Sequence, residues 1–107
     1  MSSDELRAGL HGMWSSVATS WGEHAAYVDA RSASVTERML ELSAPRPGER
    51  VLELACGPGG AGLVAAARVA PGGEVVLSDV APEMTAIALG RARALGLANV
   101  STLELDL

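Results

Sequence analysis

The sequence predicts an α/β fold, in which a small parallel sheet with crossover helices follows an N-terminal helical segment. Beyond residue 48, short apolar runs alternate with helical stretches in the order strand, helix, strand, helix, strand. A glycine-rich turn follows the first of these runs. Because strand–helix–strand crossovers are right-handed and place consecutive strands in parallel, this order predicts two joined βαβ units.

Two helices are expected in residues 1–44. Apolar side chains recur every three or four residues in the range 6–21, and Ser2 with Glu5 fits a capping box at the start of this first helix. The second helix is predicted to begin at another capping-box pattern, Ser34–Glu37, and a proline-containing linker ends it. We expect this segment to act as a helical cap or lid.

Residues 45–107 are expected to form the first half of a larger Rossmann-like domain, truncated after its third strand. The predicted strands are Val51–Ala55, Val75–Leu77 and Val100–Leu107. The first two are nearly continuous apolar runs, which predicts helices on both of their faces, whereas the third alternates as a half-exposed edge strand does. The implied strand order is 3-2-1, with the first strand innermost.

Composition excludes several classes of protein. The chain has 107 residues, a formal net charge of −5 and no basic run, so binding to nucleic acid is not expected. The acidic N-terminus and the short apolar runs predict neither a secretory signal nor a membrane span, and therefore a cytoplasmic protein. The single cysteine, Cys56, predicts no internal disulfide and no metal site, and we interpret it as a small buried residue.

The turn after the first strand carries the strongest signal for chemistry. Residues 57–62 match G-x-G-x-x-G, a pattern that lets a ligand approach backbone N–H groups at the start of a helix. Asp79 ends the second strand about 20 residues further on, where a carboxylate can accept hydrogen bonds from both hydroxyls of a ribose. The alternative is that Asp79 caps the helix that follows.

Two further acids and the N-terminal helices distinguish this chain from nicotinamide dinucleotide-binding domains. Those domains share the glycine turn and an acid at the place of Asp79, but they often begin almost directly with their first strand. Here two helices precede that strand, Glu53 lies inside it and needs a partner when buried, and Asp106 ends the third strand.

Together these residues closely resemble class I S-adenosylmethionine (SAM)-dependent methyltransferases. The three motifs of that family are similar to Glu53–Gly59, Leu77–Met84 and Asn99–Asp106, so the resemblance covers about residues 50–107. The segment Trp14–Trp21 resembles, more weakly, the quinone C-methyltransferase branch. The resemblance implies a fragment of a seven-stranded methyltransferase fold with SAM as its cofactor.

For the methionine and ribose of SAM, the resemblance implies four binding residues. Glu53 would orient the methionine amino group through water, Gly57 and Gly59 would pass beneath the methionine and ribose, and Asp79 would bind the ribose hydroxyls. The chain departs from the family pattern at Pro58, which removes one N–H donor from the turn.

For the adenine, the resemblance implies four more. Val80 and Met84 would pack on its faces, Asp106 would accept a hydrogen bond from its amino group, and the Leu107 N–H could reach a ring nitrogen. We interpret Trp14 and Trp21 as helix-packing residues in preference to substrate-stacking ones, with a lid over the cofactor as the alternative for Trp21, and His11 as a surface residue.

The implied function is the SAM-binding portion of a methyltransferase acting on a small-molecule acceptor. No catalytic residue can be named, because the family takes its acceptor groups largely from later strands, and the 107 residues alone are expected to be inactive. The alternatives are a nicotinamide-binding fragment of an oxidoreductase and a non-catalytic nucleoside-binding module. The far edge of the first strand has no partner, so we expect self-association there, unless the N-terminal helices fold back over it.

Overall fold

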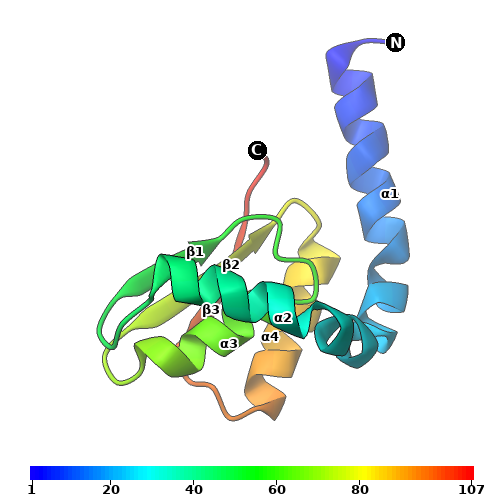
Figure 1. Cartoon of the computed structure of the whole chain (residues 1–107). Coiled ribbons are helices and arrows are strands. Elements are labelled where there is room, and N and C mark those ends of the chain that lie inside the picture. Colours follow the sequence, from blue (N-terminus) through cyan, green and yellow to red (C-terminus); the bar gives the residue numbers. More distant parts are fainter.

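The computed structural model describes all of residues 1–107, and its helices pack around one parallel sheet (Figure 1). The three strands pair in the order β1-β2-β3, both pairs parallel, with Leu52 opposite Val76 and Leu77 opposite Thr102. This confirms the predicted 3-2-1 order, although β2 rather than β1 is the middle strand of this sheet. The elements are α1 (Ser3–Glu23), α2 (Ala25–Ser43), β1 (Arg50–Glu53), α3 (Gly60–Val69), β2 (Glu74–Asp79), α4 (Pro82–Ala94) and β3 (Val100–Glu104).

The core lies on one face of the sheet, where α3 and α4 pack against β2. Val75 and Leu77 of β2 are fully buried there, beneath small side chains from both helices. Helix α2 lies along α3, joined to it by an ion pair between Glu37 and Arg68 at 2.7 Å. The helical side chains of this core are Leu40, Leu63, Ala65, Ala66, Val69, Ala88 and Ala92.

The other face of the sheet is bare. Leu52 is 54% exposed and Leu103 47%, and both side chains lie on the face opposite the core; Leu54, just beyond the end of β1, is 50% exposed. The prediction that both faces of the first strand are covered is therefore wrong for this chain. An apolar run shows that both faces of a strand can be covered by other elements, but it does not show that they are. Here helices cover only the face that carries Val75 and Leu77.

The N-terminal helices differ from expectation in their boundary. Ser2 caps α1 as predicted, since its hydroxyl accepts a hydrogen bond from the Glu5 N–H at 3.0 Å. The second helix begins at Ala25, however, and Ser34 lies in its interior. A capping pattern is a local signal, and the residues before Ser34 also favour helix, so the helix continues through it.

Helix α1 stands away from the layered body and touches it mainly through its second half (Figure 1). Ala18, its one buried residue, packs with Ala81 and Met84 at the start of α4, and Ile87 borders the same cluster. None of the helices combines the length with the apolar character that spanning a membrane requires.

The third glycine of the motif allows α3 to lie close to the sheet. A Cβ atom on Gly62 would overlap the side chain of Leu77 and come within 2.9 Å of a Glu53 carboxylate oxygen. The middle glycine, Gly59, has a φ of 95°, which favours glycine, and a Cβ there would lie 3.0 Å from the Ala88 Cβ. Both positions therefore need glycine for close packing, independently of any ligand.

We predict that Gly62→Ala lowers the free energy of unfolding by about 1–3 kcal/mol, because the added methyl group forces Leu77 and Glu53 to move. Gly90→Ala is the matched control: it also lies in a helix, but nothing stands within 4 Å of its Cβ position. This control should be neutral or stabilising by up to about 1 kcal/mol. Urea denaturation of both variants measures the difference, and equal stabilities would contradict the close-packing argument.

Candidate functional site

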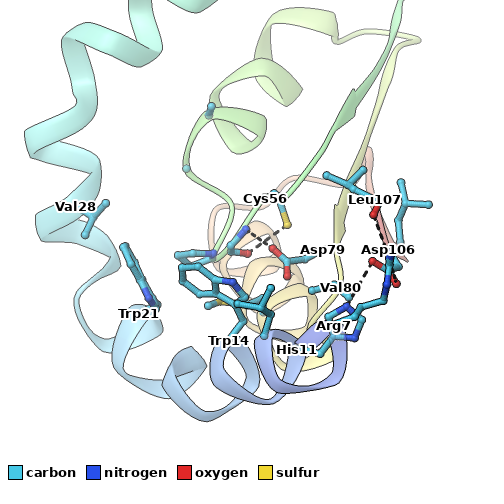
Figure 2. Close-up of a pocket in the computed structure, with 18 of the residues that line it drawn as sticks. Arg7, His11, Trp14, Trp21, Val28, Cys56, Asp79, Val80, Asp106 and Leu107 are labelled. Carbon is cyan, nitrogen blue, oxygen red and sulfur yellow. Dashed lines mark hydrogen bonds and ion pairs between the residues drawn. The ribbon is translucent and has the colours of Figure 1, made fainter. Parts of the chain in front are cut away.

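A cavity of about 810 Å³ opens at the carboxyl ends of the strands, between the sheet and the N-terminal helices. Its floor is formed by the turn after β1, the end of β2 with the start of α4, and the C-terminal tail after β3. Helices α1 and α2 supply the opposite wall (Figure 2). The volume lies within the range of small-molecule and cofactor sites.

Six of the eight predicted binding residues line this cavity, and two do not. Glu53 and Gly59 lie beneath the floor, outside the lining. The residues that the fold brings together at the cavity are Gly57, Asp79, Val80, Met84, Asp106 and Leu107.

The turn after β1 is strongly bent and fixed to β2. Ala55, Gly57 and Gly59 all have positive φ, at 51°, 54° and 95°. The Cys56 N–H donates to the Ser78 carbonyl at 2.8 Å, which continues the strand pairing into the turn. The turn therefore presents its backbone to the cavity in a fixed shape.

Asp79 joins two of the segments that form the floor. Its Oδ2 accepts a hydrogen bond from the Gly57 N–H at 2.9 Å, and its Oδ1 accepts one from the Ala81 N–H at 3.0 Å. The residue is only 9% exposed. Since each carboxylate oxygen accepts two hydrogen bonds, both oxygens keep capacity for a ligand hydroxyl. Ala81, not Asp79, is the N-cap of α4, so the alternative of a helix-capping aspartate describes only part of its contacts.

Glu53 finds its partner within the fold. Its Oε1 accepts a hydrogen bond from the Gly62 N–H in the first turn of α3, at 3.3 Å. Burial raises the pKa of Glu53 above its ordinary value, and the Gly62 hydrogen bond opposes that rise only in part. The half-buried carboxylate thus lies below the glycine turn, at the positive end of a helix.

Asp106 lies beyond the strand that was expected to contain it. Strand β3 ends at Glu104, and the tail that follows carries Asp106 to α1. Arg7 donates to the Asp106 Oδ2 at 3.0 Å, and the His11 Nε2 lies 3.4 Å from the Oδ1. The hydrogen bond from Arg7 lowers the pKa of Asp106, with smaller contributions from the charges of Arg7 and His11.

The sequence interpretation missed the residues that α1 contributes. Trp14 and Trp21 line the cavity, and Figure 2 shows both rings on its helical side. His11, which is partly exposed, also lines the cavity and contacts Asp106, a contact that its interpretation as a surface residue did not include. The signal was present in the apolar stripe of α1, but spacing alone shows which side chains share a face and not what that face meets.

The contacts of Arg91 were not predicted from the sequence. Its guanidinium donates to the Pro58 carbonyl at 2.8 Å and forms an ion pair with Asp29 of α2. A Cβ on Gly60 would lie 2.6 Å from an Asp29 carboxylate oxygen. Arg91 therefore fixes the glycine turn to both α4 and α2.

Cys56 has the surroundings of a structural residue. It is 8% exposed, and its thiol lies 3.2 Å from the Gly57 carbonyl. Burial, followed by the charges of Glu53 and Asp79, raises its pKa to about 12, so the thiol stays protonated at neutral pH. No group of three or more His, Cys, Asp or Glu side chains is placed to hold a metal ion.

A parallel sheet with a glycine turn and acidic residues at the carboxyl ends of its strands defines a Rossmann-like, nucleotide-cofactor-binding domain. Residues 45–107 match the family described as "Methyltransferase domain". That match covers more than half of the chain, which therefore belongs to this family, in the class of SAM-dependent methyltransferases.

Individual relatives and solved structures agree with this assignment. The chain is 43% identical over 67 residues to Nocamycin O-methyltransferase of Saccharothrix syringae, which covers 63% of this chain and 24% of that protein. It is 32% identical over 97 residues to 2-phytyl-1,4-naphtoquinone methyltransferase of Synechococcus elongatus, covering 91% and 33%. A SAM dependent methyltransferase from Aquifex aeolicus matches in structure with a TM-score of 0.61 at 30% identity, over 66% of this chain and 38% of that one. The chain thus spans about a quarter to a third of the length of these curated relatives.

We predict that Glu53→Gln raises the melting temperature at pH 7, because the amide still accepts the Gly62 N–H but carries no charge at this half-buried position. The folded-state pKa of Glu53 is raised, so the group favours folding while protonated and that contribution is lost as pH rises through the folded pKa. The gain of the variant should therefore shrink as pH falls toward the ordinary value of 4.5. Thermal unfolding between pH 4 and 8 measures this, with the exposed Glu23→Gln as control; a loss of stability at pH 7 would contradict it.

Proposed function

We propose that this chain is the SAM-binding portion of a methyltransferase that transfers a methyl group from SAM to a small-molecule acceptor. The observation that carries the proposal is one cavity bordered by the glycine turn, Asp79 and Asp106, at the carboxyl ends of three adjacent parallel strands. The family match supports methyl transfer. It does not favour the two alternatives, a nicotinamide-binding fragment of an oxidoreductase and a non-catalytic nucleoside-binding module.

The residues at the floor fit an adenosine with an attached amino acid. Asp79 would accept from the ribose hydroxyls with its remaining lone pairs, while Val80 and Met84 lie next to it for contact with the adenine. Glu53, below the turn, would orient the methionine amino group through a water molecule. SAM supplies a methyl group already made electrophilic by the sulfonium, so the chain need only align it and exclude water.

The wall of α1 and α2 suits an apolar acceptor. Leu6, Leu10, Trp14, Trp21 and Val28 line the cavity opposite the floor. Aromatic side chains in such a wall favour a flat, apolar molecule, and one relative is named for a naphtoquinone. The carboxylates at the cavity and the net charge of −5 disfavour a nucleic acid as the acceptor.

We predict that Asp79→Ala weakens binding of SAM and of its demethylated product, S-adenosylhomocysteine, by about 1–3 kcal/mol, as a lost pair of charge-assisted hydrogen bonds would. Asp79 also holds the Gly57 and Ala81 N–H groups, so Asp79→Asn is measured beside it to separate ligand contacts from the shape of the turn. Isothermal titration calorimetry measures the affinities, with the exposed, nearby Glu83→Ala as control.

Titration with NAD in the same experiment separates the cofactors. We expect the wild-type chain to bind S-adenosylhomocysteine in preference to NAD. Preferential binding of NAD, or equal affinity of S-adenosylhomocysteine for the wild type and both Asp79 variants, would overturn the proposed site.

We also propose that the chain self-associates through β1. This strand pairs only with β2, which leaves the backbone groups of its other edge without a strand partner. Beside that edge, Leu52 and Leu54 are about half exposed, and Leu103 of β3 is exposed at the far side of the same sheet. Helices α1 and α2 do not fold back over the free edge of β1, since α1 packs on α4 and α2 packs on α3. Open strand edges of this kind pair readily with a second chain.

We predict dimers or larger species by light scattering at micromolar concentration, whereas a monomer has a mass of 10.9 kDa. Replacing Leu52 and Leu54 together with lysine should restore the monomer, because charges on an open edge oppose pairing. The control replaces Val35 and Leu42 of α2, which are also exposed, with lysine and should leave association unchanged. A wild-type monomer would refute this proposal.

A further inference from the structure

The first half of α1 is held to the rest of the protein by few contacts. No residue between Ser3 and Trp14 is buried. Its specific polar contacts with the body are those of Arg7 and His11 with the C-terminal tail. Apart from its continuity with the second half of α1, this half of the helix is therefore tied to the body by one exposed cluster of polar side chains.

Both oxygens of the Asp106 carboxylate take part in that cluster. Arg7 Nη1 lies 3.0 Å from Oδ2, and His11 Nε2 lies 3.4 Å from Oδ1. The same Arg7 nitrogen donates to the Leu107 carbonyl at 3.3 Å. Figure 2 shows Arg7 and His11 reaching from α1 to the tail at one end of the cavity. An exposed ion pair of this kind is weak, and salt screens it.

Asp106 also borders the cavity, and under the proposed function it accepts a hydrogen bond from the adenine amino group. We propose that Arg7 and His11 form a latch, which holds Asp106 in the ligand-free protein and is displaced when the adenine binds. The inference rests on the proposed function for the identity of the ligand, but the latch itself is a property of α1. Arg7 is then a positioning residue, which acts on the ligand through Asp106.

The latch links binding of the cofactor to the position of the helical wall. When the adenine takes Asp106, the first half of α1 loses its main polar anchor and can swing away from the floor. Leu6, Leu10 and Trp14 move with it, so that the acceptor side of the cavity opens after the cofactor has bound. The acceptor would then enter second.

The test compares wild type, Arg7→Met and Arg38→Met. Methionine keeps much of the length of the arginine stem and removes its charge. Arg38 is the matched control, because it also forms an exposed ion pair, with Glu41 at 3.1 Å, but lies away from the cavity. S-adenosylhomocysteine is the probe, since it lacks the sulfonium charge of SAM and so responds less directly to the loss of a nearby arginine.

We expect Arg7→Met to bind S-adenosylhomocysteine about two- to fivefold more tightly than wild type at low salt, the range that an exposed ion pair allows. High salt should abolish this difference because it screens the latch in the wild type. Arg38→Met should match the wild type at both salt concentrations. Weaker or unchanged binding by Arg7→Met would overturn the latch, because Arg7 would then assist the ligand or have no part in its binding.

Hydrogen exchange of residues 3–14, followed by mass spectrometry, provides the second readout. The probe should accelerate exchange there in the wild type, and Arg7→Met should exchange fast without it. Slower or unchanged exchange on binding would overturn the proposal. If neither the wild type nor Arg7→Met binds the probe, the proposed function and the latch both fail. If the probe binds but neither the affinity nor the exchange changes as described, only the latch is refuted.

Discussion

The carboxylate of Asp79 is the contact on which the shape of the cavity depends. One of its oxygens holds the glycine turn after β1, and the other holds the segment that leads into α4. These two segments come from different βαβ units, so a single buried side chain at the end of β2 sets their separation. Because the same carboxylate keeps lone pairs that face the cavity, the scaffold and the predicted ribose contact share one residue, as is common where a rigid element carries a binding site.

Around this contact, small side chains set the distance between the layers. Gly62 admits the Leu77 side chain, and alanines of α3 and α4 complete the packing over β2. Close approach brings the first turn of α3 onto the Glu53 carboxylate, which is half-buried and gains a hydrogen-bond partner there. The glycine motif therefore has a packing role in this fold that is separate from the binding of any cofactor.

Much of the sheet could be predicted from sequence, because the order of strands follows from the handedness of crossovers and turns have local signals. Ser2 was found as a cap for the same reason, whereas Ser34 was misread because its pattern lies within a longer helix. The bare face of Leu52 could not be foreseen, since an apolar strand looks the same whether or not a layer covers it. Contacts such as Arg7 with Asp106 join the two ends of the chain, and no local pattern encodes them.

The one-sided sheet also affects how the protein unfolds. The cost of exposing apolar surface to water appears as the heat capacity of unfolding and as the dependence of stability on denaturant concentration. Leu52, Leu54 and Leu103 are already about half exposed to water in the folded monomer, so their contribution to both quantities is reduced. A monomer of this chain therefore unfolds over a broader range of denaturant than a protein of equal length with two covered sheet faces, and its stability curve against temperature is flatter.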